Sequence, residues 1–331
     1  MTLPAMFERY RTVIEDGLVE ALQGTSPPSA ILRYHVGLED ESGKKVRKTG
    51  KLLRPSLVLF TAEELGASLN EGLPAALALE MIHNFSLIHD DIQDQDEMRR
   101  GRPSVWRRFG IAQGINAGDL LLVKAIDLVQ GLPKTAQITK ALLTATCEMI
   151  EGQVLDVAFE GQDVGIESYL AMVEKKTGAL IRCAFQLGAL AASSPPGVLK
   201  SVCTMGLEIG KAFQICDDLL GVWGDGEITG KPQGSDIRRK KTSLPVVVAF
   251  EQAGEKELEK LRNVYKKTEI LDEDVANVVA VMDELNIRSL VEERIHQHLA
   301  RARDELGKIP FTSRGMQDME GLLDYLARRE K

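Results

Sequence analysis

A run of charged residues at the end of an apolar helical segment constrains most strongly how this chain can fold. The segment from Ile82 to Trp106 reads IHNFSLIHDDIQDQDEMRRGRPSVW. On a helix with 3.6 residues per turn, Asp90 and Asp94 lie one turn apart, with Asp91 beside them. Like charges at this spacing repel and weaken a helix, so three adjacent carboxylates indicate that a cation lies between them.

Hard divalent cations suit such a site. Mg²⁺ prefers oxygen ligands, keeps several waters, and binds through one or two carboxylates together with substrate phosphates. Arg99, Arg100 and Arg102 follow the acids, and their planar guanidinium groups match phosphate oxygens. The segment therefore predicts a site for Mg²⁺ and a diphosphate, with a solvated charged face as the alternative interpretation.

A second acidic pair lies far along the chain. Asp217 and Asp218 stand inside FQICDDLLGVWGD, which is otherwise an apolar helical segment. Acidic side chains are almost never fully buried unless they are paired or bind a metal, so this pair predicts a polar cavity that both acidic clusters can face. A helix kink or a buried ion pair is the alternative for the second pair.

The composition is that of a globular enzyme with a large core, because 44% of the 331 residues are hydrophobic and 27% are charged. A formal charge of −8 disfavours nonspecific nucleic-acid binding. No uncharged apolar run reaches about 18 residues, and the first sixteen residues are charge-rich, so we expect neither a membrane span nor a signal peptide. The cysteines form no CxxC motif, which predicts free thiols and a cytoplasmic location: Cys147, Cys183, Cys203 and Cys216.

Apolar residues recur at helical spacing along nearly the whole chain, and no segment alternates as a strand does. Residues 38–50 are polar and rich in lysine, which predicts a loop that leads to Pro55 in the first turn of a helix. We therefore predict a single all-α domain over residues 1–331. The predicted helices cover about residues 4–22, a segment ending near 37, a segment beginning near 51, then 73–98, 104–131, 134–159, 166–192 and 198–222, with further helices beginning near 241, 255, 272 and 313.

Shorter polar signals lie around the acidic clusters. Gln153 and Asp156 in EGQVLDV are one turn apart, although an ordinary helix surface has the same pattern. His83 and His89 precede the first acidic cluster, and a histidine with a satisfied partner in the core is the alternative for each. These residues are therefore weaker candidates than the aspartates.

Lysines also follow both acidic clusters. Lys176 and Thr177 lie where the polar head of KKTGAL meets an apolar helix. Lysines in a glycine-rich loop just after an acidic helix are expected to reach a phosphate, with a solvated loop as the alternative. The segment TGKPQGSDIRRKKTSLP carries three such lysines, Lys231, Lys240 and Lys241, together with Asp236.

These motifs, in this order, resemble the trans-isoprenyl diphosphate synthases of the polyprenyl synthetase family. The similarity covers about residues 45–330 and rests on GKLLRP, EMIHNFSLIHDD, DDIQD followed by RRGRP, NAGD, EGQVLD, KKTGAL and FQICDDLLGVWGD with TGKPQGSDIRRKKTSLP. The resemblance implies an all-helical bundle with a deep central cavity, usually a homodimer. It also implies condensation of isopentenyl diphosphate with an allylic diphosphate, namely dimethylallyl, geranyl or farnesyl diphosphate.

The resemblance assigns roles to the matching residues. Five aspartates are implied as ligands of about three Mg²⁺ ions: Asp90, Asp91, Asp94, Asp217 and Asp218. Three cations are implied as further contacts of the allylic diphosphate: Arg99, Lys176 and Lys231. Lys241 is implied as a further substrate-binding residue. The implied pocket for isopentenyl diphosphate consists of four residues: Lys51, Arg54, His83 and Arg100. The polar oxygens of Thr177 and Gln214 are expected to face the carbocation.

Two departures from the family pattern bear on these roles. The first motif of the family often reads GGKRxRP, whereas Thr49 and Leu52 replace a glycine and an arginine here. Lys51 and Arg54 remain, so we expect binding of isopentenyl diphosphate to persist. The second motif commonly ends in a third aspartate, and this chain has Gly221. We expect the metal site there to be weakened or rearranged.

Three rival functions have distinct sequence signatures. A class I terpene cyclase would carry an Asn/Ser/Glu metal triad in place of DDLLG, and none is found. A noncatalytic regulatory subunit would usually have lost one acidic cluster, and both are present. A helical binding module would not need lysines, arginines and acids in this order. The prenyl diphosphate synthase is therefore the favoured function.

The product length is predicted from the helix that precedes the first acidic cluster. Phe85 and Ser86 lie five and four positions before Asp90, roughly 6–8 Å along the helix axis. A large Phe85 beside a small Ser86 forms a partial floor for the growing chain, a pattern that resembles the geranylgeranyl diphosphate synthases. We therefore predict mainly C20 product, with C15 and C25 as alternatives because the deeper wall, including Met81 and Ile82, is not fixed by the sequence.

Overall fold

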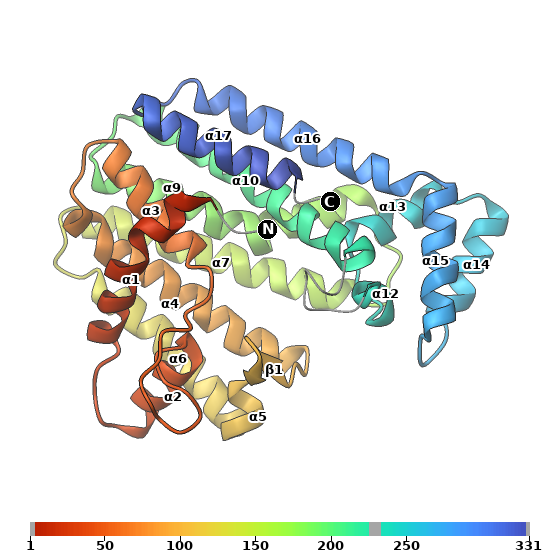
Figure 1. Cartoon of the computed structure of the whole chain (residues 1–331), viewed down its shortest axis with the longest axis horizontal. Coiled ribbons are helices and arrows are strands. Elements are labelled where there is room, and N and C mark those ends of the chain that lie inside the picture. The colour runs from red at the N-terminus through yellow and green to blue at the C-terminus, as the bar shows by residue number, and fades with distance from the viewer. Residues whose placement is uncertain (1–3, 225–232, 329–331) are drawn as a thin grey trace.

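The computed structural model describes residues 4–224 and 233–328, and nearly all regular structure in these ranges is helical (Figure 1). The all-α fold is therefore confirmed. The elements are η1 (Ala5–Phe7), α1 (Glu8–Ala21), α2 (Pro27–Val36), α3 (Leu53–Glu64), α4 (Leu69–Gln93), β1 (Met98–Arg99), β2 (Arg102–Pro103), α5 (Val105–Phe109), α6 (Ile111–Leu128), α7 (Thr135–Phe159), α8 (Ile166–Val173), η2 (Glu174–Gly178), α9 (Ala179–Ala191), α10 (Pro196–Trp223), α12 (Ser235–Arg238), α13 (Leu244–Gln252), α14 (Glu255–Tyr265), α15 (Asp272–Glu284), α16 (Ile287–Leu306) and α17 (Ser313–Arg328).

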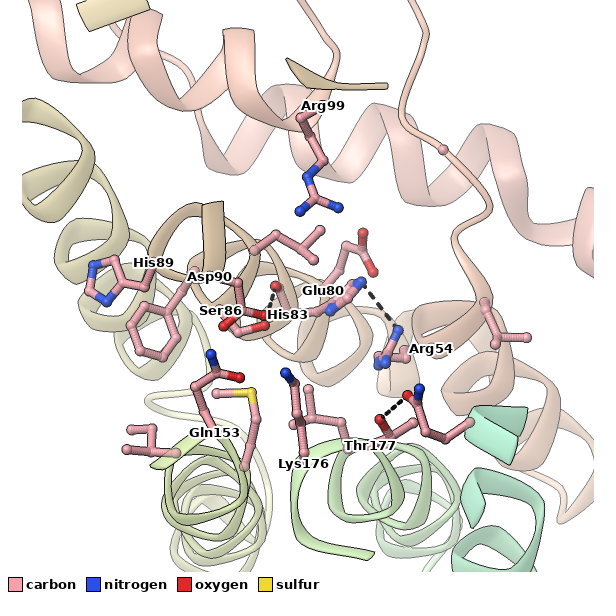
Figure 2. A pocket seen from close by; sticks show the side chains of 18 of the residues that line it. Arg54, Glu80, His83, Ser86, His89, Asp90, Arg99, Gln153, Lys176 and Thr177 are labelled. Carbon is pink, nitrogen blue, oxygen red and sulfur yellow. Dashed lines mark hydrogen bonds between the residues drawn. The ribbon is translucent and has the colours of Figure 1, made fainter. Parts of the chain in front are cut away.

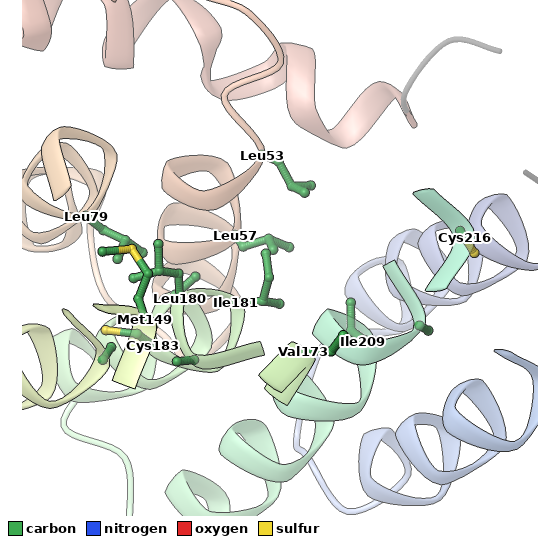
Figure 3. Close-up of a cluster of buried hydrophobic side chains, with 14 of the residues drawn as sticks. Leu53, Leu57, Leu79, Met149, Val173, Leu180, Ile181, Cys183, Ile209 and Cys216 are labelled. Carbon is green, nitrogen blue, oxygen red and sulfur yellow. The ribbon is translucent and has the colours of Figure 1, made fainter. Parts of the chain in front are cut away.

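Helix α9 lies at the centre of the bundle. Its sequence, ALIRCAFQLGALA, is apolar around most of its circumference, and a helix of this kind has to be buried on all sides. It packs against α3, α4, α7 and α10, and Figure 3 shows Leu180, Ile181 and Cys183 among apolar side chains from the neighbouring helices. Because burial of each large aliphatic side chain contributes roughly 1.5–3 kcal/mol, α9 is a firm support for the elements around it.

The two long helices α4 and α10 carry the two acidic clusters near their C-terminal ends. Helix α4 packs against α3, α6 and α9, whereas α10 packs against α9 and α16. In Figure 1, α16 and α17 lie along one side of α10, and α14 and α15 project from the end of the bundle. The α4 helix begins with a capping box, in which the Glu71 carboxylate accepts a hydrogen bond from the Ser68 N–H at 2.8 Å.

The C-terminal end of α4 differs from the prediction. The helix ends at Gln93, five residues before the predicted end at Met98. Strands β1 and β2 then pair as a short antiparallel hairpin, although no strand was predicted. Its turn has positive φ at both Arg100 (53°) and Gly101 (74°), as two-residue hairpin turns require. This hairpin brings Arg99, Arg100 and Arg102 back towards α4.

Two other predicted helices are divided by residues with positive φ, which a right-handed helix cannot accommodate. Gly110 (φ 90°) separates α5 from α6 inside the predicted helix over residues 104–131. Asn286 (φ 54°) separates α15 from α16 in the helix predicted to begin near 272. Both residue types tolerate such angles, but the apolar pattern on either side of Gly110 and Asn286 is helical, so the breaks were not predicted.

The predicted helix over residues 166–192 contains a π-helical turn, η2, between α8 and α9. Close backbone contacts surround this turn. A β-carbon on Gly210 of α10 would lie 2.7 Å from the Cα atom of Gly178, so only glycine fits there. Turns of this kind are frequent at functional sites, and η2 contains Lys176 and Thr177.

The cysteines and the helix lengths agree with the predictions made from composition. All four cysteines are free thiols, with Cys183 and Cys216 buried and Cys147 exposed. Over the ranges that the structure describes, none of the helices combines the length and the apolar character that a bilayer span requires.

Candidate active site

A cavity of about 1290 Å³ lies between α4, α7, η2 and α10. This volume exceeds that of a typical ligand pocket. In Figure 2, Asp90 and Ser86 extend from α4 towards Gln153 of α7 and Lys176 of η2. The cavity brings together most of the residues predicted from the sequence: Lys51, Arg54, His83, Phe85, Ser86, Asp90, Arg99, Arg100, Lys176, Thr177, Gln214 and Asp217.

Asp90 and Asp94 lie at the last turn of α4. Asp90 lines the cavity, and burial raises the pKa of its carboxyl to about 6, with Lys176 opposing the rise and Asp94 adding to it. Asp94 is the C-cap residue of the helix; it is exposed and, like Asp91, is not among the residues that line the cavity. A carboxylate that is desolvated beside another carboxylate is stabilised when a divalent cation binds it.

Asp91 has different surroundings from its two neighbours. It is only 1% exposed, and its Oδ1 atom accepts hydrogen bonds from Nε of Arg99 at 2.9 Å and from the Nη2 group of the same arginine. It is not among the residues that line the cavity. The geometry therefore favours a role in orienting Arg99 over the predicted role as a metal ligand.

The second acidic pair also divides into two kinds of residue. Asp217 lines the cavity. Asp218 is 1% exposed, and it accepts hydrogen bonds from the Leu244 N–H at 3.0 Å, from Gln214 Nε2 at 3.0 Å and from the Tyr169 hydroxyl. Burial raises the pKa of Asp218 to about 7. Because protein donors already surround this carboxylate, the geometry favours Asp217 over Asp218 as a metal ligand.

The donor set of the cavity fits Mg²⁺. Asp90 on α4 and Asp217 on α10 supply hard oxygen atoms from different walls. Within residues 4–224 and 233–328, no three histidine, cysteine, aspartate or glutamate side chains converge closely enough to hold an ion by themselves. Mg²⁺ does not need such a cluster, because it is usually bound by one or two carboxylates with waters and substrate phosphates completing its octahedron.

The π-helical turn presents two polar side chains to the cavity. Lys176 forms an ion pair with Asp156 of α7. The Thr177 hydroxyl donates a hydrogen bond to Oε1 of Gln214 at 2.7 Å, and Gln214 in turn donates to Asp218. This chain of hydrogen bonds fixes the oxygens of Thr177 and Gln214 at the cavity wall. Figure 2 shows the hydrogen bond at Thr177 as a dashed line.

Arg54 and His83 form the wall at the start of α3. Nη1 of Arg54 lies 3.2 Å from Nε2 of His83. Burial, and then the charges of Arg54 and Arg100, keep the pKa of His83 well below its ordinary value, so the neutral ring accepts this hydrogen bond. Among the described residues, the buried Nε atom of Arg54 has no hydrogen-bond partner. A buried guanidinium N–H of this kind calls for an anionic acceptor in the cavity.

Arg100 also lines the cavity, and hydrogen bonds hold its guanidinium group. Its Nη1 and Nη2 groups donate to the His35 carbonyl at 3.1 Å and to Oδ1 of Asn84 at 3.3 Å. Both Arg100 (φ 53°) and Leu52 (φ 49°) adopt the left-handed conformation, which is costly for a side chain of either type. Strain of this kind persists where the surrounding structure enforces it, most often at functional sites.

Glu80 also lines the cavity, although it was not among the residues predicted from the sequence. Its side chain is 3% exposed, and Oε1 accepts a hydrogen bond from Nδ2 of Asn84 at 2.9 Å. Burial raises the pKa of Glu80, while Arg100 and Arg54 lower it. Glu80 is an acid within an apolar helical run, the same signal that identified Asp217, so that signal could have found it.

The deeper part of the cavity has an aromatic wall. Phe85 contacts His89 edge to face, with ring centroids 4.9 Å apart, and His89 Nε2 lies 3.3 Å from the Ile115 carbonyl. A β-carbon on Gly118 of α6 would lie 2.2 Å from the same Nε2 atom, so α6 holds the imidazole ring against Phe85. Further apolar side chains line this region: Leu122, Met149, Ile150, Val154 and Val157.

The two remaining predicted cations lie elsewhere or outside the described residues. Lys241 is not part of the cavity lining, and its ammonium group lies 3.5 Å from Oδ1 of Asp218 and 3.9 Å from Oδ2 of Asp236. Lys231 lies outside the described residues, so its predicted role stays a prediction.

Comparison with known proteins gives consistent matches. Residues 38–282 match the family described as Polyprenyl synthetase. The chain is 36% identical over 307 residues to the (2E,6E)-farnesyl diphosphate synthase of Mycobacterium tuberculosis, covering 91% of this chain and 86% of the relative. It is 37% identical over 257 residues to the geranylgeranyl diphosphate synthase of the same organism, covering 76% and 73%. Among solved structures, a polyprenyl synthetase from Streptomyces coelicolor A3(2) superposes with a TM-score of 0.91 at 34% identity, covering 97% of this chain and 98% of that chain.

Proposed function

Because this chain belongs to the polyprenyl synthetase family and is a prenyltransferase, we propose that it condenses isopentenyl diphosphate head-to-tail with an allylic diphosphate, releasing pyrophosphate. One observation carries the proposal. Carboxylates from two helices, Asp90 and Asp217, line the same cavity as five cationic side chains: Lys51, Arg54, Arg99, Arg100 and Lys176. Two anionic substrates and the ions that bridge them to carboxylates need this combination of charges.

The proposed reaction begins with cleavage of the allylic C–O bond, which leaves a carbocation and pyrophosphate. Mg²⁺ at Asp90, Asp94 and Asp217 would neutralise the charge that develops on the leaving group. Lys176 and Arg99 add positive charge at fixed positions, since η2 and the β1–β2 hairpin hold them. Asp91 orients Arg99 through the hydrogen bonds to its carboxylate. Cations that are already in place stabilise the leaving group without reorganisation.

The polar oxygens near η2 are suited to stabilise the allylic carbocation that cleavage of the C–O bond leaves. Thr177 and Gln214 are hydrogen-bonded to each other at 2.7 Å, and their remaining lone pairs are available to stabilise the carbocation. Electrons of the isopentenyl double bond then form the new C–C bond, and the resulting cation loses a proton to pyrophosphate. No side-chain nucleophile takes part, so none is needed in the cavity.

The second diphosphate is assigned to the wall formed by Arg54, His83 and Arg100, with Lys51 beside it. The buried Arg54 Nε atom, which has no partner among the described residues, supports this assignment. Phosphate oxygens would complete its hydrogen bonding. Isopentenyl diphosphate would then lie next to the neutral imidazole of His83, on the opposite side from the leaving group.

The proposed main product is C20 geranylgeranyl diphosphate, with C15 and C25 as the alternatives. Phe85 is 5% exposed and packs on His89, so it forms an aromatic floor, while the small Ser86 leaves room beside it. Relatives at 36% and 37% identity carry names with farnesyl and geranylgeranyl products, so identity alone does not choose between these lengths.

We also propose that the active form is a homodimer, with residues 1–331 of each chain forming one isoprenyl diphosphate synthase domain in the cytoplasm. Large apolar side chains are exposed along α6 and α7, which is unusual for a surface that faces only water. Four residues outside the cavity lining make up this strip: Ile111, Ile115, Val123 and Leu143. A second copy of the chain would cover them.

The test is incubation of the purified chain with Mg²⁺, isopentenyl diphosphate and each of three allylic primers, followed by identification of the products. Linear prenyl diphosphates that require both substrates support the proposal. Cyclic hydrocarbon from an allylic diphosphate alone would instead indicate a terpene cyclase. No product from any primer, with correct folding, would favour the noncatalytic subunit. Chelation of Mg²⁺ by EDTA should abolish turnover, and addition of excess Mg²⁺ should restore turnover.

A further inference from the structure

The segment that carries Lys51 into the cavity is anchored to α1 by a side chain. The Thr49 hydroxyl donates a hydrogen bond to Oε1 of Glu15 at 2.7 Å, and the two residues are only 2% and 4% exposed. Glu15 lies on α1, 34 residues earlier in the chain. A buried carboxylate without a donor is costly, so this contact holds Thr49 in place.

A second contact from α1 holds the next residue of the segment. Nη1 of Arg11 donates to the Gly50 carbonyl at 3.1 Å. Gly50 has a φ of 82°, and a β-carbon there would lie 3.2 Å from Nε of Arg100. The Gly50 backbone therefore lies close to an arginine of α1 and to an arginine of the cavity wall. Residues 49–51 all line the cavity.

Helix α1 is a firm support for these contacts because it is packed on the bundle. The Tyr10 hydroxyl donates to Oε2 of Glu63 in α3 at 2.6 Å. A β-carbon on Gly17 would lie 2.7 Å from Cδ1 of Leu77 in α4, so the two helices approach closely there. Helix α1 therefore fixes residues 49–51 relative to α3 and α4, which form part of the cavity wall.

The negative charge of the anchor is compensated where it lies. Nη1 of Arg47 is 3.4 Å from Oε2 of Glu15, and Nη1 of Arg11 is 3.5 Å from Oε1 of the same carboxylate. Nearby positive charge and the Thr49 hydroxyl together stabilise a buried carboxylate. Glu15 can therefore lie behind the segment of Lys51 with little repulsion of an anionic substrate.

We propose that Thr49 and Glu15 are positioning residues for isopentenyl diphosphate, and that α1 is part of the support of its pocket. The inference rests on the proposed function for the identity of the ligand. The family pattern often has glycine at position 49, and glycine has no hydroxyl to donate. Threonine adds a fixed point to a segment that holds Leu52 at a φ of 49°, which is costly for leucine. Lys51 is then in place before the substrate binds, which favours binding.

The test begins with the KM values of threonine variants. Thr49→Val replaces the hydroxyl by a methyl group and should raise the KM for isopentenyl diphosphate by about fivefold or more, whereas kcat and the allylic KM should change by less than about twofold. Thr49→Ser keeps the hydroxyl and should stay within about twofold of wild type in all three values. If Thr49→Val does not fold, Thr49→Gly takes its place with the same expected rise. An unchanged isopentenyl KM, or an equal rise for both substrates, overturns the proposed role.

Thr146→Val is the matched control. Thr146 is 3% exposed, and its hydroxyl donates to the Leu142 carbonyl at 2.7 Å within α7, outside the cavity lining. Both valine variants remove a buried hydroxyl, so both should lower Tm, but Thr146→Val should leave both KM values unchanged. A similar rise in the isopentenyl KM for both variants would mean that lost stability is the cause, and would overturn the inference.

A double-mutant cycle tests whether Thr49 acts through Glu15. Glu15→Met removes the carboxylate and should raise the KM for isopentenyl diphosphate as Thr49→Val does. The double variant should differ from Glu15→Met by less than about twofold, because the same hydrogen bond can be lost only once. Additive losses would show that the two residues act separately, and would overturn the inference.

The Arg11 contact provides an independent variant that leaves the buried pair intact. Arg11→Gln removes the guanidinium group that reaches the Gly50 carbonyl, and it should raise the KM for isopentenyl diphosphate by about threefold or more. Arg9→Gln is the control on the same helix, because Arg9 pairs with Glu63 of α3. If Arg11→Gln behaves as Arg9→Gln does, the role of α1 in the pocket is overturned.

A binding measurement makes the inference independent of turnover. Isothermal titration calorimetry with isopentenyl diphosphate alone, without Mg²⁺, should give a Kd that is about fivefold or more higher for Thr49→Val than for wild type. If the wild type forms no prenyl product but binds this ligand, the proposed function fails and the Kd values still decide the role of Thr49. Equal Kd values, or no binding to the wild type, overturn the inference.

Discussion

The backbone of Gly152 in α7 touches the backbone of Lys176 in the π-helical turn. A β-carbon on Gly152 would lie 2.3 Å from the Lys176 nitrogen and 2.6 Å from its Cα. Only glycine permits this approach. The contact therefore sets the position of η2 relative to α7, and with it the positions of the Lys176 and Thr177 side chains in the cavity wall.

Gly152→Ala should push η2 away from α7, and overpacking of this kind costs about 1–3 kcal/mol. We expect a Tm lower by several degrees and a higher KM for the allylic diphosphate, since the Lys176 ammonium moves. Gly197→Ala in the first turn of α10 is the matched control, because a β-carbon there meets nothing within 4 Å. If the two variants have the same Tm and the same KM for the allylic diphosphate, the contact between Gly152 and η2 does not affect function.

Asp90→Ala or Asp94→Ala should lower kcat by roughly 10²–10³, because the leaving group loses a metal-binding carboxylate. Steady-state turnover at saturating Mg²⁺ measures this. Asp127→Ala, an exposed aspartate on α6, provides the control. Turnover of the Asp90 variant within about tenfold of wild type would count against the assignment of the first acidic cluster.

Arg54→Ala should raise the KM for isopentenyl diphosphate by roughly 10–100-fold, since a hydrogen bond to a charged group contributes about 1.5–3 kcal/mol. The KM for the allylic primer should change far less, because the cavity has a separate cationic wall for it. Arg9→Ala removes an arginine whose ion pair with Glu63 lies on the surface, and it should change neither value. Equal rises in both KM values would mean that the two pockets are wrongly assigned.

Phe85→Ala should shift the product distribution towards longer chains, because the aromatic floor is removed. Product analysis by chain length is the measurement. Ile88→Ala is the matched truncation: Ile88 is fully buried on the same helix but does not line the cavity. It should lower stability and leave the products unchanged. An unchanged distribution for Phe85→Ala would remove the physical basis of the C20 prediction.

The elements that the sequence predicted well are those with strong local signals. Helical periodicity predicts α7 almost to the residue, because its apolar stripe is long and ends at Phe159. The paired acids predict the cavity because burial of a carboxylate without a partner is costly. Breaks that depend on one backbone angle, as at Gly110, carry a much weaker signal and were missed.

Which aspartate of each adjacent pair lines the cavity could not be predicted from the sequence. Asp90 and Asp91 are neighbours of the same chemical type, and only the position of Arg99 distinguishes them. Asp218 is likewise set apart from Asp217 by Tyr169, which lies 49 residues earlier in the chain. Such differences arise from tertiary packing. Helical periodicity turns adjacent residues towards different sides of a helix, but it does not say which of the two faces the cavity.

Under the proposed function, the reacting end and the floor of the cavity are built on one rigid element. Asp90 and Phe85 both project from α4, and their separation along its axis is about 7.5 Å. Loops that move around the cavity cannot alter that separation. Helix α4 therefore acts as a ruler whose marks are its residues that line the cavity, such as Phe85 and Ser86, each at a set distance from Asp90. Changes in product length during evolution would then come in discrete steps, through substitution at one mark, and not through gradual change elsewhere in the fold.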